Sequence, residues 1–392
     1  MKILIFLPML TEGGAEHQGF LLARYLKDRG YAVEVWGFAN RRGLGSLIPK
    51  LKRWGLEYQE IRWQLRGRRL FTRPATNLMS WIGHALMKIQ YYSLPKHLAK
   101  RKFDVVIPFT FWPSLIASAY YSKWSAGICV WNHRGGYDDG KISYNRAFVR
   151  GVLRHRPIFV ANSLIGARFL RDKFNLKPDE VFVIRNCFIP EGALIQNKST
   201  RFPLDLDLSL VHVANFFPQK DYETILEALR LLKERQIPFR MHFFGGFLSA
   251  EDEQQFLARV RHLQLSSHVS YHGARSHDEI LEFLNSADVG LLSSSNEGQP
   301  NALMEYMYAG LPIIATRIPG IQEVAGSINE PWLFDPRDSV GLAVRIESLF
   351  ANPELRASLG RQNRDRILRH FGPDQTLRQW EQLVLSRLTN HA

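Results

Sequence analysis

Two glutamates, Glu297 and Glu305, stand eight positions apart in a segment whose residue types suit the binding of a polar ligand. Glu297 lies in a polar turn that contains Gly298, and Glu305 lies in the helical pattern that follows. A carboxylate accepts hydrogen bonds, so both side chains are suited to bind hydroxyl groups of a ligand beside the helix start. We interpret them as hydroxyl receptors and not as a general acid and base pair.

The same helix start is suited to phosphate. Proline is favoured at the first position of a helix, and the amides that follow Pro300 would then point out of the helix N-terminus, where phosphate oxygens are favoured. The candidate donor-binding residues of this segment are Glu305, Gly298, Gln299, Pro300, Asn301, Ala302 and Leu303.

Apolar runs that predict strands alternate with helical patterns along the chain, which indicates parallel α/β units. The first series has strands at 3–7, 32–38, 105–108, 126–131 and 158–161, with a helix at 15–29. The second series begins after Pro203, with strands at 209–214, 239–244 and 289–293 and a helix at 222–235. Ser276 and Glu279 predict a capping box at another helix start. We therefore expect two Rossmann-like sheets joined near residues 190–207.

The charge of the 392-residue chain is uneven. Its formal net charge is +14, yet residues 1–190 hold 31 basic and 12 acidic residues, so the excess lies in the first half. A basic surface attracts phosphate groups, whichever molecule carries them. Two cysteines, Cys129 and Cys187, argue against a disulfide framework or a thiolate zinc site and favour a reducing compartment. The longest charge-free apolar stretch, 105–121, is interrupted by prolines and too short to predict a transmembrane helix.

These features together resemble the acidic Glu-x7-Glu signature of the retaining glycosyltransferases of family 4, which have the two-domain GT-B fold. The similarity extends to segments elsewhere in the chain, namely Gly13-Gly14-Ala15-Glu16, Ala161-Asn162-Ser163, Val183-Ile184-Arg185-Asn186, Phe244-Gly245-Gly246 and Gly310-Leu311-Pro312. It covers nearly the whole chain except residues 41–103. It implies that Glu297 contacts the transferred sugar, that Glu305 holds the nucleotide ribose and that the helix N-terminus cradles the diphosphate.

The resemblance adds residues outside this segment. It implies a catalytic set of Glu297, His133 and Lys220, with Lys220 on the departing diphosphate and His133 beside the transferred sugar; a histidine that merely caps a loop is the alternative for His133. Glu16 and Arg134 are candidates for acceptor or phosphate contacts. Further donor-binding candidates are Asn215, Gly245, Gly273, Arg275, Gly13 and Gly14.

Two positions depart from the family pattern. Asn215 stands where many members carry the arginine of a cationic clamp, so half of that clamp is absent beside Lys220. Cys187 stands where glycine usually follows Asn186, and the sequence offers no interpretation of that change.

Residues 62–102 contain ten basic residues and no acidic one, with tryptophan and tyrosine interleaved. This composition favours an anionic membrane surface, where each base near the lipid adds about 1 kcal/mol; a solvated face, or an anionic glycan or nucleic acid, are the alternatives. Two metal-like patterns carry less weight. Asp205-Leu206-Asp207 precedes a strand where nothing positions a nucleotide, and the spacing of His262, His268, His272 and His277 matches no zinc site. We expect no metal.

We therefore expect a GT-B enzyme with an acceptor-binding domain at 1–195, a linker at 196–207, a nucleotide-sugar domain at 208–373, residues 374–392 crossing back to the first domain, and the active site in the cleft between the domains. It would transfer a hexose-type sugar, from a UDP-sugar in preference to a GDP-sugar, to a hydroxyl of a glycan or lipid-linked glycan in cell-surface polysaccharide synthesis. No other cofactor and no specific nucleic acid are expected, and the enzyme would be cytoplasmic and peripheral on the inner face of the membrane. The alternatives are a catalytically idle binding protein for polyanions and a sugar-nucleotide epimerase.

Overall fold

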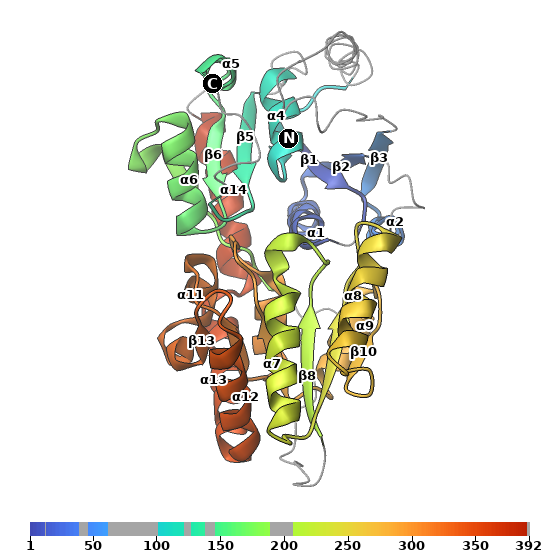
Figure 1. Ribbon diagram of the computed structural model, residues 1–392. Coiled ribbons are helices and arrows are strands. Elements are labelled where there is room, and N and C mark those ends of the chain that lie inside the picture. Colours follow the sequence, from blue (N-terminus) through green and yellow to red (C-terminus); the bar gives the residue numbers. More distant parts are fainter. Residues whose placement is uncertain are drawn as a thin grey trace. The chain divides into compact units, whose positions relative to one another are not determined.

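The computed structural model describes residues 1–11, 13–38, 46–61, 101–120, 127–137, 146–188 and 207–389. The chain divides into two compact units, shown in Figure 1. Unit 1 comprises Met1–Arg185 and Asp374–Ala392, and unit 2 comprises Asn186–Pro373. The sequence predicts that the first domain ends at residue 195 and that the second ends at residue 373.

The described part of unit 1 has a seven-stranded sheet whose strands pair in parallel, in the order β3-β2-β1-β4-β5-β6-β7. The strands are β1 (Lys2–Met9), β2 (Ala32–Phe38), β3 (Glu57–Ile61), β4 (Val105–Pro108), β5 (Ile128–His133), β6 (Ile158–Ala161) and β7 (Val181–Val183). Helices α1 (Gly14–Asp28), α2 (Ile48–Arg53), α4 (Phe111–Tyr120), α5 (Arg146–Leu153) and α6 (Leu164–Phe174) and the 3-10 turn η2 (Pro178–Glu180) connect them. Strand β4 is apolar throughout and β1 is apolar after Lys2, as expected where both faces of a parallel sheet are covered.

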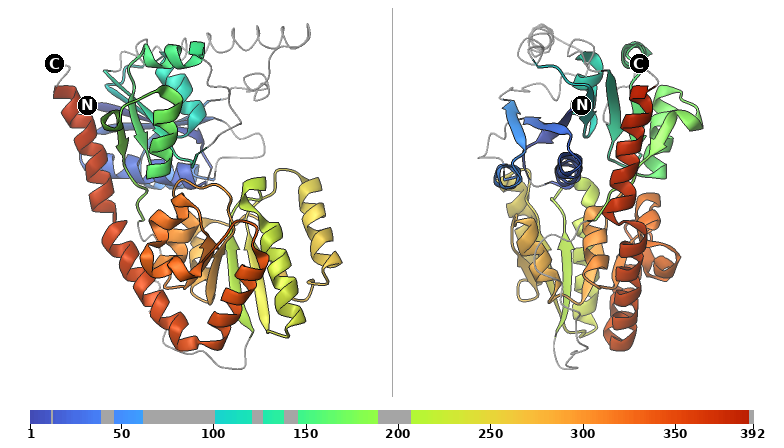
Figure 2. Two further views of the ribbon diagram at one scale, coloured as in Figure 1. Left: turned by 60° about the vertical axis from the view of Figure 1, so that its left-hand side comes forward. Right: turned by 180° about the vertical axis from the view of Figure 1, so that it is seen from behind.

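Helix α14 (Pro373–Thr389) belongs almost entirely to unit 1, although it comes last in the chain. Its Glu381 carboxylate accepts hydrogen bonds from Tyr25 (3.0 Å) and Tyr31 (2.9 Å) and pairs with Arg29 (3.3 Å). Trp380 is buried near Phe109, which follows β4. Figure 2 shows the helix lying against unit 1.

Within its described residues, unit 2 has a six-stranded parallel sheet in the order β10-β9-β8-β11-β12-β13. Its strands are β8 (Leu208–Val213), β9 (Phe239–Phe244), β10 (Val269–Tyr271), β11 (Val289–Leu292), β12 (Ile313–Thr316) and β13 (Leu333–Phe334). Its helices are α7 (Tyr222–Glu234), α8 (Ala250–His262), α9 (His277–Leu284), α10 (Asn301–Tyr308), α11 (Pro319–Ala325), α12 (Ser339–Ala351) and α13 (Pro353–His370), with 3-10 turns η3 (Pro218–Lys220) and η4 (Ser327–Trp332).

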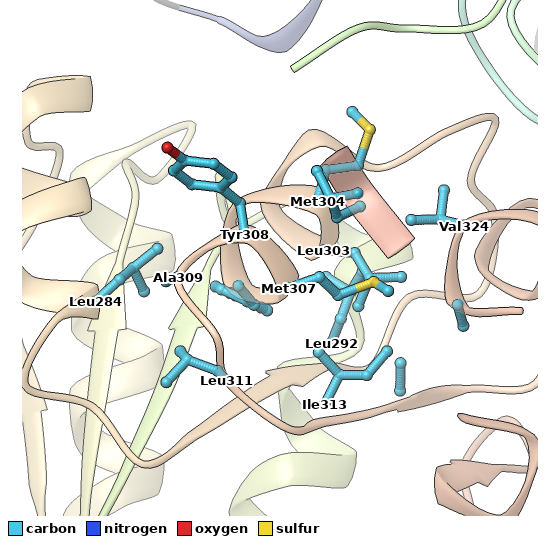
Figure 3. Close-up of a cluster of buried hydrophobic side chains, with 14 of the residues drawn as sticks. Leu284, Leu292, Leu303, Met304, Met307, Tyr308, Ala309, Leu311, Ile313 and Val324 are labelled. Carbon is cyan, nitrogen blue, oxygen red and sulfur yellow. The ribbon is translucent and has the colours of Figure 1, made fainter. Parts of the chain in front are cut away.

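Apolar side chains on the two faces of the unit 2 sheet form separate clusters. One cluster joins the sheet to α7, α8 and α12, and the other joins it to α9, α10 and α11. In the second cluster Leu303 and Met307 of α10 meet Leu292 and Ile313 of the sheet (Figure 3). Full burial of such a side chain contributes about 1.5–3 kcal/mol, so this packing fixes α10 on β11 and β12.

Local signals in the sequence account for several element ends. The predicted capping box is confirmed, because the Ser276 hydroxyl accepts from the Glu279 amide and the Glu279 carboxylate accepts from the Ser276 amide. Gly310 follows α10 with φ 73°, a left-handed conformation that favours glycine. Pro300 is the residue before α10 and not its first residue. Five of the described strands were not predicted from the sequence, namely β3, β7, β10, β12 and β13.

Candidate active site

The candidate site in unit 2 lies where the strand order reverses, between β8 and β11. Ligands of open parallel sheets bind outside the carboxyl ends of the strands at such a point. The loop after β8 ends with Lys220, and the loop after β11 contains Glu297. The two loops are joined directly, since the Ser295 amide donates to the Gln219 carbonyl (2.8 Å) and the Ser293 hydroxyl to the Lys220 carbonyl (2.9 Å).

Lys220 and Glu297 form an ion pair across these loops. Both side chains are largely but not completely buried, with 20% and 12% of their surfaces exposed. The ammonium group of Lys220 is able to donate to phosphate oxygens, and the Glu297 carboxylate is able to accept from ligand hydroxyls. The sequence-predicted cation and one of the two predicted hydroxyl receptors therefore lie together at one sheet edge.

The N-terminus of α10 opens at the same edge. The Met304 amide donates to the Pro300 carbonyl (3.4 Å), and the amides of Asn301, Ala302 and Leu303 precede this bond at the helix start. The positive end of the helix dipole lies there and favours an anion. Gly298, Gln299 and Pro300 form the buried turn that leads into the helix.

Glu305 occupies a buried position inside α10, with 8% of its surface exposed. Its carboxylate lies 3.6 Å from Nδ1 of His277, the first residue of α9. Burial raises the pKa of the Glu305 carboxyl, and His277 acts in the opposite direction. In the sequence, His277 is noted only as one of four closely spaced histidines whose spacing matches no zinc site. The capping box located the start of α9 but gave no sign that its first residue faces α10.

The loops after β8, β9 and β10 bring Asn215, Gly245 and Gly273 close to one another. The Asn215 side-chain oxygen accepts from the Gly246 amide (3.1 Å), and the Gly245 amide donates to the Gly273 carbonyl (2.9 Å). Gly245 has φ 136°, and a β-carbon there would lie 1.9 Å from the Ala214 carbonyl oxygen, so only glycine fits. Asn215 thus stabilises a turn at the position where the family pattern often has arginine. Arg275 lies two residues after Gly273. Burial lowers the pKa of His272, and the charge of Arg275 lowers it further.

In unit 1, Gly13, Gly14 and Glu16 lie at the start of α1. Gly13 precedes the helix and Gly14 is its first residue. Burial raises the pKa of the Glu16 carboxyl to about 7, against an opposing hydrogen bond from its own backbone. A β-carbon on Gly13 would lie 2.4 Å from Glu16 Oε2, so the carboxyl folds back over the loop.

His133 and Arg134 come at the end of β5. His133 is the last residue of the strand, stacks on Phe169 with ring centroids 4.7 Å apart, and hydrogen-bonds the Gly136 carbonyl (2.8 Å). The Arg134 guanidinium lies 4.8 Å from the Phe109 ring centroid and 5.5 Å from that of Trp380. The predicted acceptor and phosphate contacts of these two residues remain predictions.

Among the described residues, no group of three or more histidine, cysteine, aspartate or glutamate side chains is placed to hold a metal ion. Asp207 pairs with Arg240 (2.9 Å), and Asp205 lies outside the described ranges. His272 hydrogen-bonds His242 (3.0 Å). In the part of the chain that the structure describes, no helix has the length and apolarity to cross a bilayer. Most of the basic stretch 62–102 lies outside the described residues, which resume at Arg101.

Two family models match the chain. Residues 12–191 match the model described as Glycosyltransferase Family 4, and residues 198–366 match the model described as Glycosyl transferases group 1. Together they cover most of both units, including the loops that carry Gly13, Lys220 and Glu297.

Curated relatives and solved structures agree with these matches. EpsD of Bacillus subtilis is 36% identical over 163 residues, which is 42% of each protein, and the amylovoran biosynthesis glycosyltransferase AmsK of Erwinia amylovora is 30% identical over 153 residues, which is 38% of this chain and 37% of AmsK. The chain therefore spans well under two thirds of the length of these relatives. The structure of Anabaena HepE in complex with UDP and glucose aligns with a TM-score of 0.77 and 16% identity, over 98% of this chain and all of HepE. The GT-B fold class expected from the sequence is confirmed.

Proposed function

Because the chain belongs to the family 4, group 1 glycosyltransferases, we propose that it transfers a hexose-type sugar from a nucleoside diphosphate to a hydroxyl of a glycan or lipid-linked glycan, with retention at the anomeric carbon. The observation that carries the proposal is the Lys220–Glu297 ion pair beside the N-terminus of α10. The ammonium group of Lys220, the carboxylate of Glu297, which accepts hydrogen bonds from ligand hydroxyls, and the first amides of α10 thus lie at the ligand-binding edge of one sheet.

The chemistry follows from where charge develops. As the bond from the anomeric carbon to the diphosphate breaks, negative charge grows on the leaving phosphate. Lys220 and the first amides of α10 stabilise that charge, and groups already fixed in place need no reorganisation. Glu297 orients the sugar through its hydroxyls, and Glu305 holds the ribose. The oxygen of the acceptor hydroxyl bonds to the anomeric carbon on the face that the diphosphate leaves, and the leaving phosphate takes the hydroxyl proton. We therefore propose neither a side-chain nucleophile nor a side-chain base.

The donor proposed is a UDP-sugar. The structural relative HepE was solved with UDP and glucose and with UDP-glucose, and these complexes motivate the choice of nucleotide. The names of curated relatives refer to amylovoran, colanic acid and lipopolysaccharide core biosynthesis, which motivates a role in surface polysaccharide synthesis.

The acceptor side is assigned to unit 1. We propose that Glu16 in the first turn of α1 and Arg134 directly after β5 contribute to it. Gly13 and Gly14 remain candidates for donor binding, and His133 remains a candidate for the catalytic set. The basic composition of residues 62–102 supports docking on an anionic membrane on the cytoplasmic side. Liposome co-sedimentation that requires anionic lipid and declines with salt tests the docking. Equal binding to neutral and anionic liposomes would reject it.

The central experiment has two steps. Nucleotide sugars are first ranked by the rise in melting temperature, since a ligand at 100 times its Kd stabilises the protein by about 2.7 kcal/mol. Transfer from the best donor is then measured in excess EDTA, and NMR of the new linkage gives its configuration.

We expect full transfer in EDTA and retention. Asp207→Asn serves as a control, because its carboxylate pairs with Arg240, and its transfer rate should equal the parent rate. Loss of transfer in EDTA with rescue by magnesium, or an inverted product, would contradict the mechanism. Binding of polyanions without any transfer would favour the idle binding protein.

A further inference from the structure

The first residue of unit 2, Asn186, is bonded to the loop that carries Glu297. The division between the units falls between Arg185 and Asn186. The Asn186 amide donates to Gln299 Oε1 (2.6 Å), and its side-chain nitrogen donates to the Gln299 carbonyl (3.0 Å) and to Asn301 Oδ1 (2.8 Å). These bonds join positions more than a hundred residues apart in the chain.

The partners of Asn186 bracket the start of α10. Gln299 is two residues after Glu297, and Asn301 is the first residue of the helix. Asn186 and Gln299 are buried, with 4% and 6% of their surfaces exposed. Buried hydrogen bonds of this kind are costly to break because the unsatisfied groups cannot turn to water. The position of the helix start is therefore tied to the position of residue 186.

Ile184, two residues before Asn186, is hydrogen-bonded within unit 1. The Ile184 amide donates to the Ala161 carbonyl (2.9 Å), and Arg134 Nη1 donates to the Ile184 carbonyl (3.5 Å). Arg185 is exposed and is the single residue between the two anchors. The first residue of unit 2, Asn186, is therefore also the residue that is hydrogen-bonded to the Glu297 loop.

We propose that Asn186 is a positioning residue, whose amide holds the Glu297 loop and the first turn of α10 in register for the donor diphosphate. The choice of asparagine follows from its chemistry. Its side-chain nitrogen has two N–H donors, which match the two acceptors it meets, the Gln299 carbonyl and Asn301 Oδ1. The role of the site in sugar transfer rests on the proposed function, whereas the support of the loop rests on the hydrogen bonds alone.

The test replaces this amide by an isosteric group with the wrong polarity. In Asn186→Asp an acceptor oxygen faces the two acceptors, while the backbone bond to Gln299 Oε1 is retained. Asn363→Asp is the matched control. Asn363 is fully buried in the same unit, its side-chain nitrogen donates to the Leu311 carbonyl (2.8 Å), and its oxygen accepts from Asn329 (2.7 Å).

Three measurements are made on the full chain. Hydrogen exchange reports on the peptide that spans residues 295–303, calorimetry gives the affinities for UDP and for uridine, and steady-state kinetics gives kcat and KM for the donor. We expect faster exchange in this peptide for Asn186→Asp, weaker UDP binding with unchanged uridine binding, and a kcat lower by about tenfold to a hundredfold, as expected for a small misplacement of reacting groups. Asn363→Asp should not selectively change the exchange of this peptide, the affinity for UDP or kcat.

The outcomes separate the two proposals. Parent-like exchange in 295–303 for Asn186→Asp, or equal acceleration in Asn363→Asp, would overturn the positioning role. Absence of transfer and of nucleotide binding in the parent would refute the proposed function, and the exchange arm would still decide the role of Asn186. If Asn186→Asp does not fold, Asn301→Ala removes one acceptor of the same network and is judged by the same three measurements.

Discussion

A β-carbon on Gly320 would lie 2.2 Å from the carbonyl oxygen of Glu297. Such a β-carbon would also lie 2.4 Å from the Gly298 carbonyl oxygen. The first turn of α11 therefore lies directly against the backbone of the Glu297 loop, with no room for a side chain between them. Asn186 is hydrogen-bonded to this loop where α10 begins, and Gly320 of α11 restricts the space beside the loop backbone.

Gly320→Ala should displace the Glu297 loop. Overpacking of this kind costs about 1–3 kcal/mol, and the shift should lower sugar transfer more than it lowers nucleoside binding. Denaturant unfolding and donor kinetics measure both effects. Gly151→Ala is the control, because a β-carbon there meets no atom within 4 Å and alanine in a helix interior gains about 0.5–1 kcal/mol over glycine. Unchanged transfer in Gly320→Ala would show that the loop tolerates the displacement.

The two glutamates should fail in different ways. Glu305→Ala should weaken nucleotide binding by about tenfold to a hundredfold, since a hydrogen bond to a charged group contributes about 1.5–3 kcal/mol. Glu297→Gln should lower turnover without weakening nucleotide binding, because Lys220 loses its charged partner and remains able to meet the diphosphate. Calorimetry with UDP and turnover assays separate the effects. Parent-like behaviour of both variants would refute the site.

Glu16 should make stability depend on pH. Its folded pKa of about 7 lies above the ordinary value of 4.5, so the folded state keeps a proton that the unfolded state releases between these values. Stability from this group therefore falls as pH rises from 4.5 to 7. Glu16→Gln should match the parent at pH 4 and exceed it by up to roughly 3 kcal/mol at pH 8. A constant difference in the free energy of unfolding at both pH values would contradict this assignment.

Glu381 should show the opposite dependence. Burial alone would raise the pKa of the Glu381 carboxyl. The hydrogen bonds from Tyr31, Tyr25 and Arg29 outweigh burial and hold this pKa below its ordinary value. The stability that the carboxylate contributes is then present above pH 4.5 and is lost as pH falls through the lowered pKa. Glu381→Gln should destabilise the protein at pH 7 and converge with the parent in acid, as followed by thermal unfolding. Gln382→Ala, at an exposed position of the same helix, should leave stability unchanged throughout.

Local patterns in the sequence predicted the frame of the site. The alternation of strands and helices predicted two parallel sheets, and the polar turn before Pro300 predicted where α10 begins, to within one residue. Glu297 was singled out from its own segment and Lys220 from the family resemblance, and the strand order explains why they meet. The element ends depend on short-range chemistry, which is readable from neighbouring residues.

The supports of the site depend on contacts between distant segments and were missed. Nothing near His277 in the sequence indicates that it faces Glu305. Asn186 was noted as part of a motif, yet its bonds to Gln299 and Asn301 follow only from the folded path of the chain. Gly320 has an ordinary backbone conformation, so only the approach of the Glu297 loop requires glycine there. The predicted membrane stretch at 62–102 lies mostly outside the described residues and stays a prediction.

The position of α14 has a consequence for biosynthesis. Unit 2 is continuous, from Asn186 to Pro373, whereas unit 1 receives Trp380 and Glu381 from the last helix. Domains generally fold as they leave the ribosome, the N-terminal one first. In this chain the N-terminal unit emerges first but lacks α14 until after all of unit 2 has been synthesised, so unit 2 is the first unit able to complete its fold.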